Sequence, residues 1–180
     1  YTALNELNSD MVNIVTVEDP VEANVDGVNQ VQVNPKANLT FGNALRSILR
    51  QDPDIIMIGE IRDRETASIA VQASITGHLV VSTLHTNDTA SSVTRLLDMG
   101  VESYLIADAL TGIIAQRLVR RLCPNCKRRH VLLEHELEYL GLTPEEKDSA
   151  EVYEPVGCQR CAGTVYFKQN AIYEIMEITP

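Results

Sequence analysis

Apolar residues follow two alternating patterns through most of the chain. Short continuous apolar runs are typical of strands that are buried on both faces of a sheet. The expected strands are 12–20, 54–60 and 78–86. Between these runs, apolar residues recur every three or four positions, which is the spacing of an amphipathic helix. The expected helices are 39–51, 65–77, 87–100 and a longer one at 103–122.

Residues at the ends of these segments support the assignments. Thr40 is a suitable N-cap for the first helix, and Gly77 closes the second. Polar and apolar residues alternate over 25–35, which predicts a short edge strand or a hairpin. Strands that alternate with helices indicate an α/β core with a largely parallel sheet.

The character of the sequence changes after Leu122, where cysteines, charges and turn residues dominate. We therefore expect three parts. They are a core at 1–122, a small separate module at 123–170, and a C-terminal tail of the core at 171–180.

Composition limits the classes of function. The chain has 180 residues, a hydrophobic fraction of 44% and a formal net charge of −10. Nucleic-acid binding is therefore not expected as the main role, because phosphate contacts need clustered Lys and Arg. One local basic cluster surrounds the first two cysteines, formed by Arg117, Arg120, Arg121, Lys127, Arg128 and Arg129. No apolar run reaches the roughly 18 residues of a membrane-spanning helix, and no signal-peptide pattern is present.

Polar side chains follow the expected strands. Glu18 and Asp19 end the first strand, Glu60 ends the second, and His85 ends the third, which opens with His78. Ligands of open α/β sheets bind beyond the carboxyl ends of the strands, where acids hold Mg²⁺ or orient an attacking water. A single such acid is as easily a solvated residue or a helix cap. Three strand ends together favour a site.

The histidine pair allows two interpretations. Either histidine alone is readily explained as a hydrogen-bonded core or turn residue. Because seven residues separate His78 from His85 across a strand, we expect them at opposite strand ends. We interpret them as hydrogen-bonding sensors and not as a pair of metal ligands.

The four cysteines form two C-x-x-C pairs, Cys123 with Cys126 and Cys158 with Cys161. Such pairs are the usual turns of a structural Zn²⁺ site with four thiolate ligands. Disulfides and a redox-active pair are weaker alternatives without a secretion signal. A helical segment at 132–142 is expected to fill the long gap between the pairs.

Three segments carry a resemblance to a known family. They are "VTVEDPVE" (15–22), "LRQDPDIIMIGEIRD" (49–63) and "TGHLVVSTLHTND" (76–88). They resemble the Asp box, Walker B box and His box of the ATPases of type II secretion and type IV pilus assembly. The second segment is the most specific, and with the cysteines the resemblance covers nearly the whole chain.

The resemblance implies roles for individual residues. Glu18 matches the acid that polarises the attacking water, and Glu60 matches the Walker B glutamate near Mg²⁺. Asp19 adjoins the first acid in the same motif. His78 and His85 match the His-box pair that links nucleotide state to neighbouring subunits.

The arginines are matched less closely. Arg62 resembles a family arginine near the nucleotide. Arg46 and Arg50 lie on the preceding helix, either as inter-subunit arginines or on an exposed helix face. A guanidinium near a γ-phosphate stabilises the charge that spreads over the transferring oxygens.

The family as a whole implies a RecA-like P-loop NTPase core with a Cys₄ zinc module. Its members form homo-hexameric motors that use ATP with Mg²⁺ at the cytoplasmic face of the inner membrane, in contact with secretion or pilus platform proteins. The tetracysteine module belongs to the assembly and secretion branch.

Two features depart from the family. The chain has no Gly-Lys dipeptide and therefore no phosphate-binding loop. We expect a core truncated at its N-terminus, and a degenerate paralogue is the alternative. In addition, Val165 and residues 167–170 replace the glycine-rich turn and basic residues that precede "IYE" in the family.

Overall fold

The computed structural model describes residues 1–179, apart from the side chains of Pro144 and Asp148. The chain divides into two compact units. The first contains Tyr1–Ala115 and the chain from Glu174 onward, and the second contains Gln116–Tyr173.

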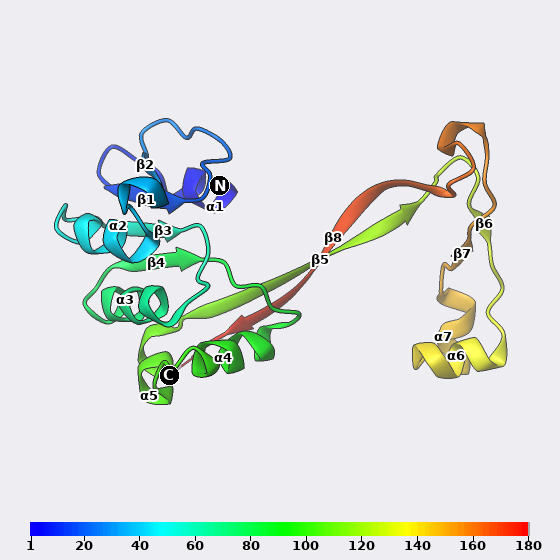
Figure 1. Ribbon diagram of the computed structural model, residues 1–180. Helices are drawn as coiled ribbons and strands as arrows, with labels where there is room; N and C mark the ends of the chain where they lie inside the picture. Colours follow the sequence, from blue (N-terminus) through cyan, green and yellow to red (C-terminus); the bar gives the residue numbers. More distant parts are fainter. Residues whose placement is uncertain (180) are drawn as a thin grey trace. The chain divides into compact units, whose positions relative to one another are not determined.

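The first unit is built on a four-stranded sheet in which every neighbouring pair is parallel. Its strands are β1 (Ile14–Glu18), β2 (Asn29–Gln32), β3 (Ile55–Ile58) and β4 (Leu79–Ser82). The spatial order is β2-β1-β3-β4, so β2 is an edge strand and the hairpin alternative at 25–35 is wrong. The α/β class and the parallel sheet are confirmed (Figure 1).

Both faces of this sheet are covered. Val17, Ile56 and Ile58 point into the larger core, which they share with α2 (Phe41–Ile48) and α3 (Arg64–Ile75). The intervening residues of the same strands, including Ile14 and Ile55, pack with Leu4 of α1 (Thr2–Leu7) on the other face. Burial on two faces explains why these strands are continuous apolar runs.

Side-chain caps begin the helices that connect the strands. Thr40 accepts a hydrogen bond from the Asn43 backbone N–H, as expected of an N-cap. Asp63 caps α3 and Asp88 caps α4 (Thr89–Asp98) in the same way. Asp63 and Asp88 lie soon after the ends of β3 and β4, and so they fix where the chain turns back after these strands.

One expected element is wrong. The helix at 103–122 is instead a short helix, α5 (Ser103–Ala109), followed by a long strand, β5 (Gly112–Leu122). β5 forms a two-stranded sheet with β8 (Tyr166–Glu177). Its backbone hydrogen bonds therefore come from residues far along the chain, which local helical spacing does not reveal.

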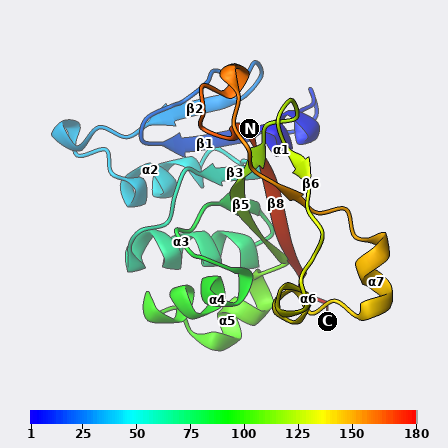
Figure 2. The ribbon, with the colours of Figure 1, turned by 90° about the vertical axis from the view of Figure 1, so that its right-hand side faces the viewer.

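The second unit contains all four cysteines and two short helices. An antiparallel pair is formed by β6 (Arg128–Arg129) and β7 (Tyr153–Glu154) (Figure 1). The chain between these strands forms α6 (Glu134–Leu140) and α7 (Pro144–Ser149), which Figure 2 shows from another side. The helix expected at 132–142 is confirmed as α6. Two short 3₁₀ helices complete the structure, η1 (Pro35–Ala37) and η2 (Gln159–Cys161).

Two residues at the start of β8, one directly before the strand and one within it, have an unusual backbone conformation. Val165 and Lys168 have positive φ angles, 63° and 66°. Glycine adopts this left-handed region freely, whereas a β-branched residue is strained there. Among the residues 165 and 167–170 that were singled out from the sequence, these two thus have a backbone conformation typical of glycine. Within the part of the chain that the structure describes, no helix is long and apolar enough to span a membrane.

Candidate functional site

Glu18 ends β1 with its side chain only 3% exposed. Its carboxylate accepts hydrogen bonds from Thr16 Oγ1 at 2.5 Å, from Gln30 Nε2 at 3.0 Å, and from the Tyr1 hydroxyl. Burial alone raises the pKa of this carboxyl, but the three hydrogen bonds outweigh burial and hold the pKa below its usual value. Glu18 is therefore a buried carboxylate that is charged at neutral pH.

Glu60 lies just beyond the end of β3, after Gly59, and is 9% exposed. Its carboxylate accepts a hydrogen bond from Arg62 Nε, and His85 Nε2 lies 3.1 Å from the same oxygen. Burial again raises the pKa, and the contacts with Arg62 and His85 reverse the direction, so the pKa of Glu60 is lowered. This second acid is also charged at neutral pH.

Gly59 explains how the two acids come to lie at neighbouring strand ends. Its N–H donates to the Val17 carbonyl at 2.8 Å. A Cβ at this position would lie 3.3 Å from both the Cα of Glu18 and the carbonyl oxygen of Val17. Glycine fits this close approach best, because an added Cβ would force the neighbouring backbone to shift. Gly59 thus keeps the chain beyond β3 packed against the end of β1.

The two histidines lie at opposite ends of β4, as their spacing predicts. His85 joins the Glu60 cluster, with its own side chain 81% exposed. His78 precedes the strand, where its Nδ1 lies 3.0 Å from the carbonyl oxygen of Ala73 and 3.3 Å from Thr76 Oγ1. His78 thus contacts the C-terminal end of α3 and is not brought to the acids.

The other charged candidates are more exposed. Arg62 reaches Glu60 although 66% of its side chain is exposed, and Asp19 is exposed beside Glu18. Arg46 on α2 forms an exposed ion pair with Glu65 at 2.6 Å, at the rim of a cavity of about 550 Å³. Arg50 lies exposed just after α2.

One contact near these residues was not expected from the sequence. Glu174 of β8 accepts hydrogen bonds from the hydroxyl and the backbone N–H of Thr89, the first residue of α4. Thr89 is only 3% exposed and begins the helix that follows the His85 loop. The contact joins residues 85 positions apart in the sequence. A helix N-terminus favours a negatively charged partner, but the sequence does not indicate which acid takes that place.

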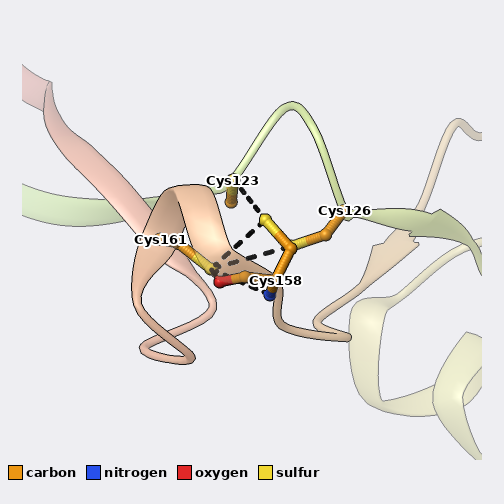
Figure 3. Close-up of side chains that lie close together, drawn as sticks. All are labelled: Cys123, Cys126, Cys158 and Cys161. Carbon is orange, nitrogen blue, oxygen red and sulfur yellow. Dashed lines mark hydrogen bonds between the residues drawn. The ribbon is translucent and has the colours of Figure 1, made fainter.

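The four cysteines converge in the second unit (Figure 3). Their sulfur atoms all lie within 4.8 Å of one another, and three of the sulfur pairs are 3.8–4.0 Å apart. Thiolates bound tetrahedrally at about 2.3 Å from an ion lie about 3.8 Å apart. A disulfide requires about 2 Å between sulfurs, so all four are free thiols with the spacing of a Cys₄ metal site.

The surroundings of the cluster fit a structural metal site. Cys123 is fully buried and Cys161 is 5% exposed. Burial first, together with contacts from the other cysteines, raises the pKa of Cys126 to about 12. Hydrogen bonds from the Asn125 side chain and the Cys161 backbone lower the pKa of Cys158 to about 6. At neutral pH Cys126 therefore holds a proton that a bound metal must displace, whereas Cys158 is mostly a thiolate.

Comparisons with known proteins agree with this geometry. The profile of the family described as "Type II/IV secretion system protein" matches residues 1–180. The "Type IV pilus assembly ATPase PilB" of Acinetobacter baylyi is 58% identical over 182 aligned positions, which cover 100% of this chain and 31% of that protein. The "Type II secretion system protein E" of Aeromonas hydrophila is 51% identical, with 99% and 35% covered. The chain thus spans about a third of the length of these relatives.

A solved structure matches the fold. The crystal structure of the pilus retraction motor PilT with bound ADP is similar with a TM-score of 0.60 and 37% identity, over 68% of this chain and 38% of that one. The α/β fold with its parallel sheet is therefore that of a PilT-like ATPase. With the profile match over its whole length, the chain belongs to the type II/IV secretion system protein family.

Proposed function

We propose that this chain is the part of a type II secretion or type IV pilus assembly ATPase that supplies the acidic side of its nucleotide site. The observation that carries the proposal is the pair Glu18 and Glu60. Both are buried and both are held in the charged form. Glu18 ends β1, and Glu60 lies just beyond the end of the neighbouring parallel strand β3. Ligands of α/β sheets bind beyond such strand ends.

The residues take distinct roles in this proposal. Glu18 polarises the attacking water, and Glu60 holds a water of the Mg²⁺ that accompanies ATP. Arg62 and His85 keep Glu60 ionised and oriented through their contacts with its carboxylate. Asp19, exposed beside Glu18, completes the acidic side of the site.

The proposal extends to the assembled motor. Arg46 and Arg50 are exposed and near the same sheet, so they are available to a neighbouring subunit of a homo-hexamer. His78 contacts α3 and serves as a sensor between subunits. The hexamer acts at the cytoplasmic face of the inner membrane, on secretion or pilus platform proteins.

Zn²⁺ is the proposed ion of the Cys123, Cys126, Cys158 and Cys161 cluster. Four thiolates leave no open coordination position, so the role of the zinc is structural.

The 180-residue polypeptide has no phosphate-binding loop of its own. By itself it is expected neither to bind ATP tightly nor to hydrolyse it, because backbone N–H groups and a lysine of that loop hold the phosphates.

A chimera tests the catalytic roles. This chain replaces the matching segment of the Acinetobacter baylyi relative, with which it is 58% identical, and steady-state ATPase activity is measured. Glu60→Gln and Glu18→Gln should each lower kcat by about 10²–10⁴-fold, the range of a lost acid or base. Glu6→Gln, at an exposed acid of α1 outside the three motifs, is the matched control and should leave kcat unchanged.

A non-catalytic interaction module is the second candidate. It is favoured by exposed apolar side chains in the second unit, such as Tyr139 at 90% and Val131 at 74%. A folded, hexameric chimera without ATPase activity would favour this candidate and contradict the catalytic proposal.

A further inference from the structure

The helix α6 presents an uncovered apolar surface that a metal site does not require. A cavity of about 410 Å³ lies against it, lined by Leu132, Tyr139, Leu140 and Val152 together with polar side chains. Leu132 is buried at its floor, whereas Tyr139 is 90% and Leu140 is 51% exposed. We call these four residues the α6 surface.

Further apolar side chains border the α6 surface. Val131 is 74% exposed and Leu133 is 54% exposed, directly before the helix. Single exposed apolar residues are ordinary, but contiguous exposed apolar patches mark sites of interaction. An exposed tyrosine beside a cavity is a typical anchor residue of a protein–protein interface.

The charge of residues 132–154 is mainly negative, and Arg128 of the neighbouring β6 is paired with one of these acids, Glu154. From Leu132 to Glu154 the sequence has eight acidic residues and a single basic one, Lys147. Glu134 and Glu138 are exposed one turn apart on α6 itself. Such a rim repels the phosphates of nucleic acids and the headgroups of anionic lipids, and it attracts Lys and Arg.

The rim also contains a fixed polar network. His130 Nε2 lies 2.8 Å from Glu136 Oε2, and Arg128 Nη2 lies 2.6 Å from Glu154 Oε1. The first contact ties the chain after β6 to the start of α6, and the second joins β6 to β7. The rim is therefore held in place before any partner binds, which lowers the entropic cost of docking.

We propose that the α6 surface docks a helix of a partner protein whose apolar face is bordered by Lys and Arg. The exposed tyrosine and leucine would pack against the apolar face, in the manner of a helix bound in a groove. The surrounding carboxylates would pair with the basic border and select against acidic partners. This role is separate from the acids of the first unit.

The test is a titration of the zinc-loaded 180-residue chain into a fluorescent synthetic helix with leucines on one face and lysines beside them. A peptide of the same composition in scrambled order controls for charge alone. Tyr139→Ser should weaken binding at least about tenfold, as loss of an interface anchor does. Glu134→Lys with Glu138→Lys should weaken it as well and reduce its salt dependence.

A matched control variant is Tyr104→Ser, since this tyrosine of α5 is 63% exposed and lies in the first unit. It should bind as the unchanged chain does. Amide NMR spectra verify that each variant is folded. Equal binding of the scrambled peptide, or unchanged binding by Tyr139→Ser, would overturn the proposal. So would Tyr139-dependent self-association in sedimentation, or Tyr139-dependent binding to vesicles of anionic lipid.

Discussion

Removal of the metal should unfold the second unit and leave the first unit folded. The reason is the small amount of apolar burial in the second unit. Among the described residues of Gln116–Tyr173, the buried apolar side chains are Leu132 and Leu137, and the buried thiols are Cys123 and Cys161. The first unit, by contrast, has a continuous core on both faces of its sheet.

The magnitudes decide which interaction holds the second unit together. Burial of two leucines contributes about 3–6 kcal/mol in total, whereas ordering the backbone costs about 1–2 kcal/mol per residue. Structural zinc in small peptides contributes on the order of 10–16 kcal/mol. The metal therefore stabilises the second unit more than apolar burial does, and its loss exceeds the stability of an ordinary domain of this size.

Hydrogen exchange measured by mass spectrometry checks this prediction. After chelation, amides of α6, β6 and β7 should exchange at the rate of an unfolded chain, while amides of β1 and β3 keep their protection. Added zinc should restore the protection, and Cys158→Ser should cause the same loss without a chelator. Protection of α6 in a sample shown to contain no metal would refute the reasoning.

Three further changes have defined outcomes. Val165→Gly should raise the free energy of unfolding, measured by urea titration, by about 1 kcal/mol. The reason is that valine is strained at a φ of 63°. The control, Val156→Gly, should lower the free energy of unfolding. Glu174→Gln should speed hydrogen exchange at the start of α4, since a charge-assisted hydrogen bond contributes roughly 1.5–3 kcal/mol. His130 should titrate by NMR above its usual pKa, because its contact with Glu136 raises that pKa, and Glu136→Gln should reverse the shift.

The sign of the pH effect follows from the raised pKa of His130. The stabilisation from its contact with Glu136 is fully present below the unfolded pKa of about 6.5. It is lost as the pH rises through the higher folded pKa. A free energy of unfolding that instead increased over this pH window would contradict the contact.

The control for the Glu174 prediction is Glu177→Gln, at the exposed last residue of β8. Equal hydrogen exchange at the start of α4 in the two variants would contradict a role for Glu174.

Local signals in the sequence predicted the elements whose causes are local. The apolar runs predicted β1, β3 and β4, and Thr40 predicted the start of α2. β4 is less buried than expected, because it lies at the end of the strand order. The two C-x-x-C pairs predicted a four-cysteine cluster, since each pair forms its own turn and one metal requires both pairs. In each case the residues are neighbours in the sequence or are ligands suited to the same metal ion.

Features that depend on distant residues were not predictable in this way. The strand β5 resembles a helix in its spacing, and only its pairing with β8 makes it a strand. The bonds from Thr89 to Glu174 likewise join segments that no local pattern connects. His78 and His85 belong to one sequence motif, but they lie at different places in the structure. His78 contacts the end of α3, whereas His85 contacts Glu60.

The pairing of β5 with β8 has a consequence for the evolution of this chain. Hydrogen bonds from Ile178 to Thr111 and from Cys123 to Val165 show that the two strands run in opposite directions. The cysteine region therefore leaves and rejoins through two adjacent strands, and its ends lie close together. A segment with adjoining ends can be replaced by a tight turn without rerouting the remaining chain. A lineage could gain or discard the whole cysteine region as a single cassette.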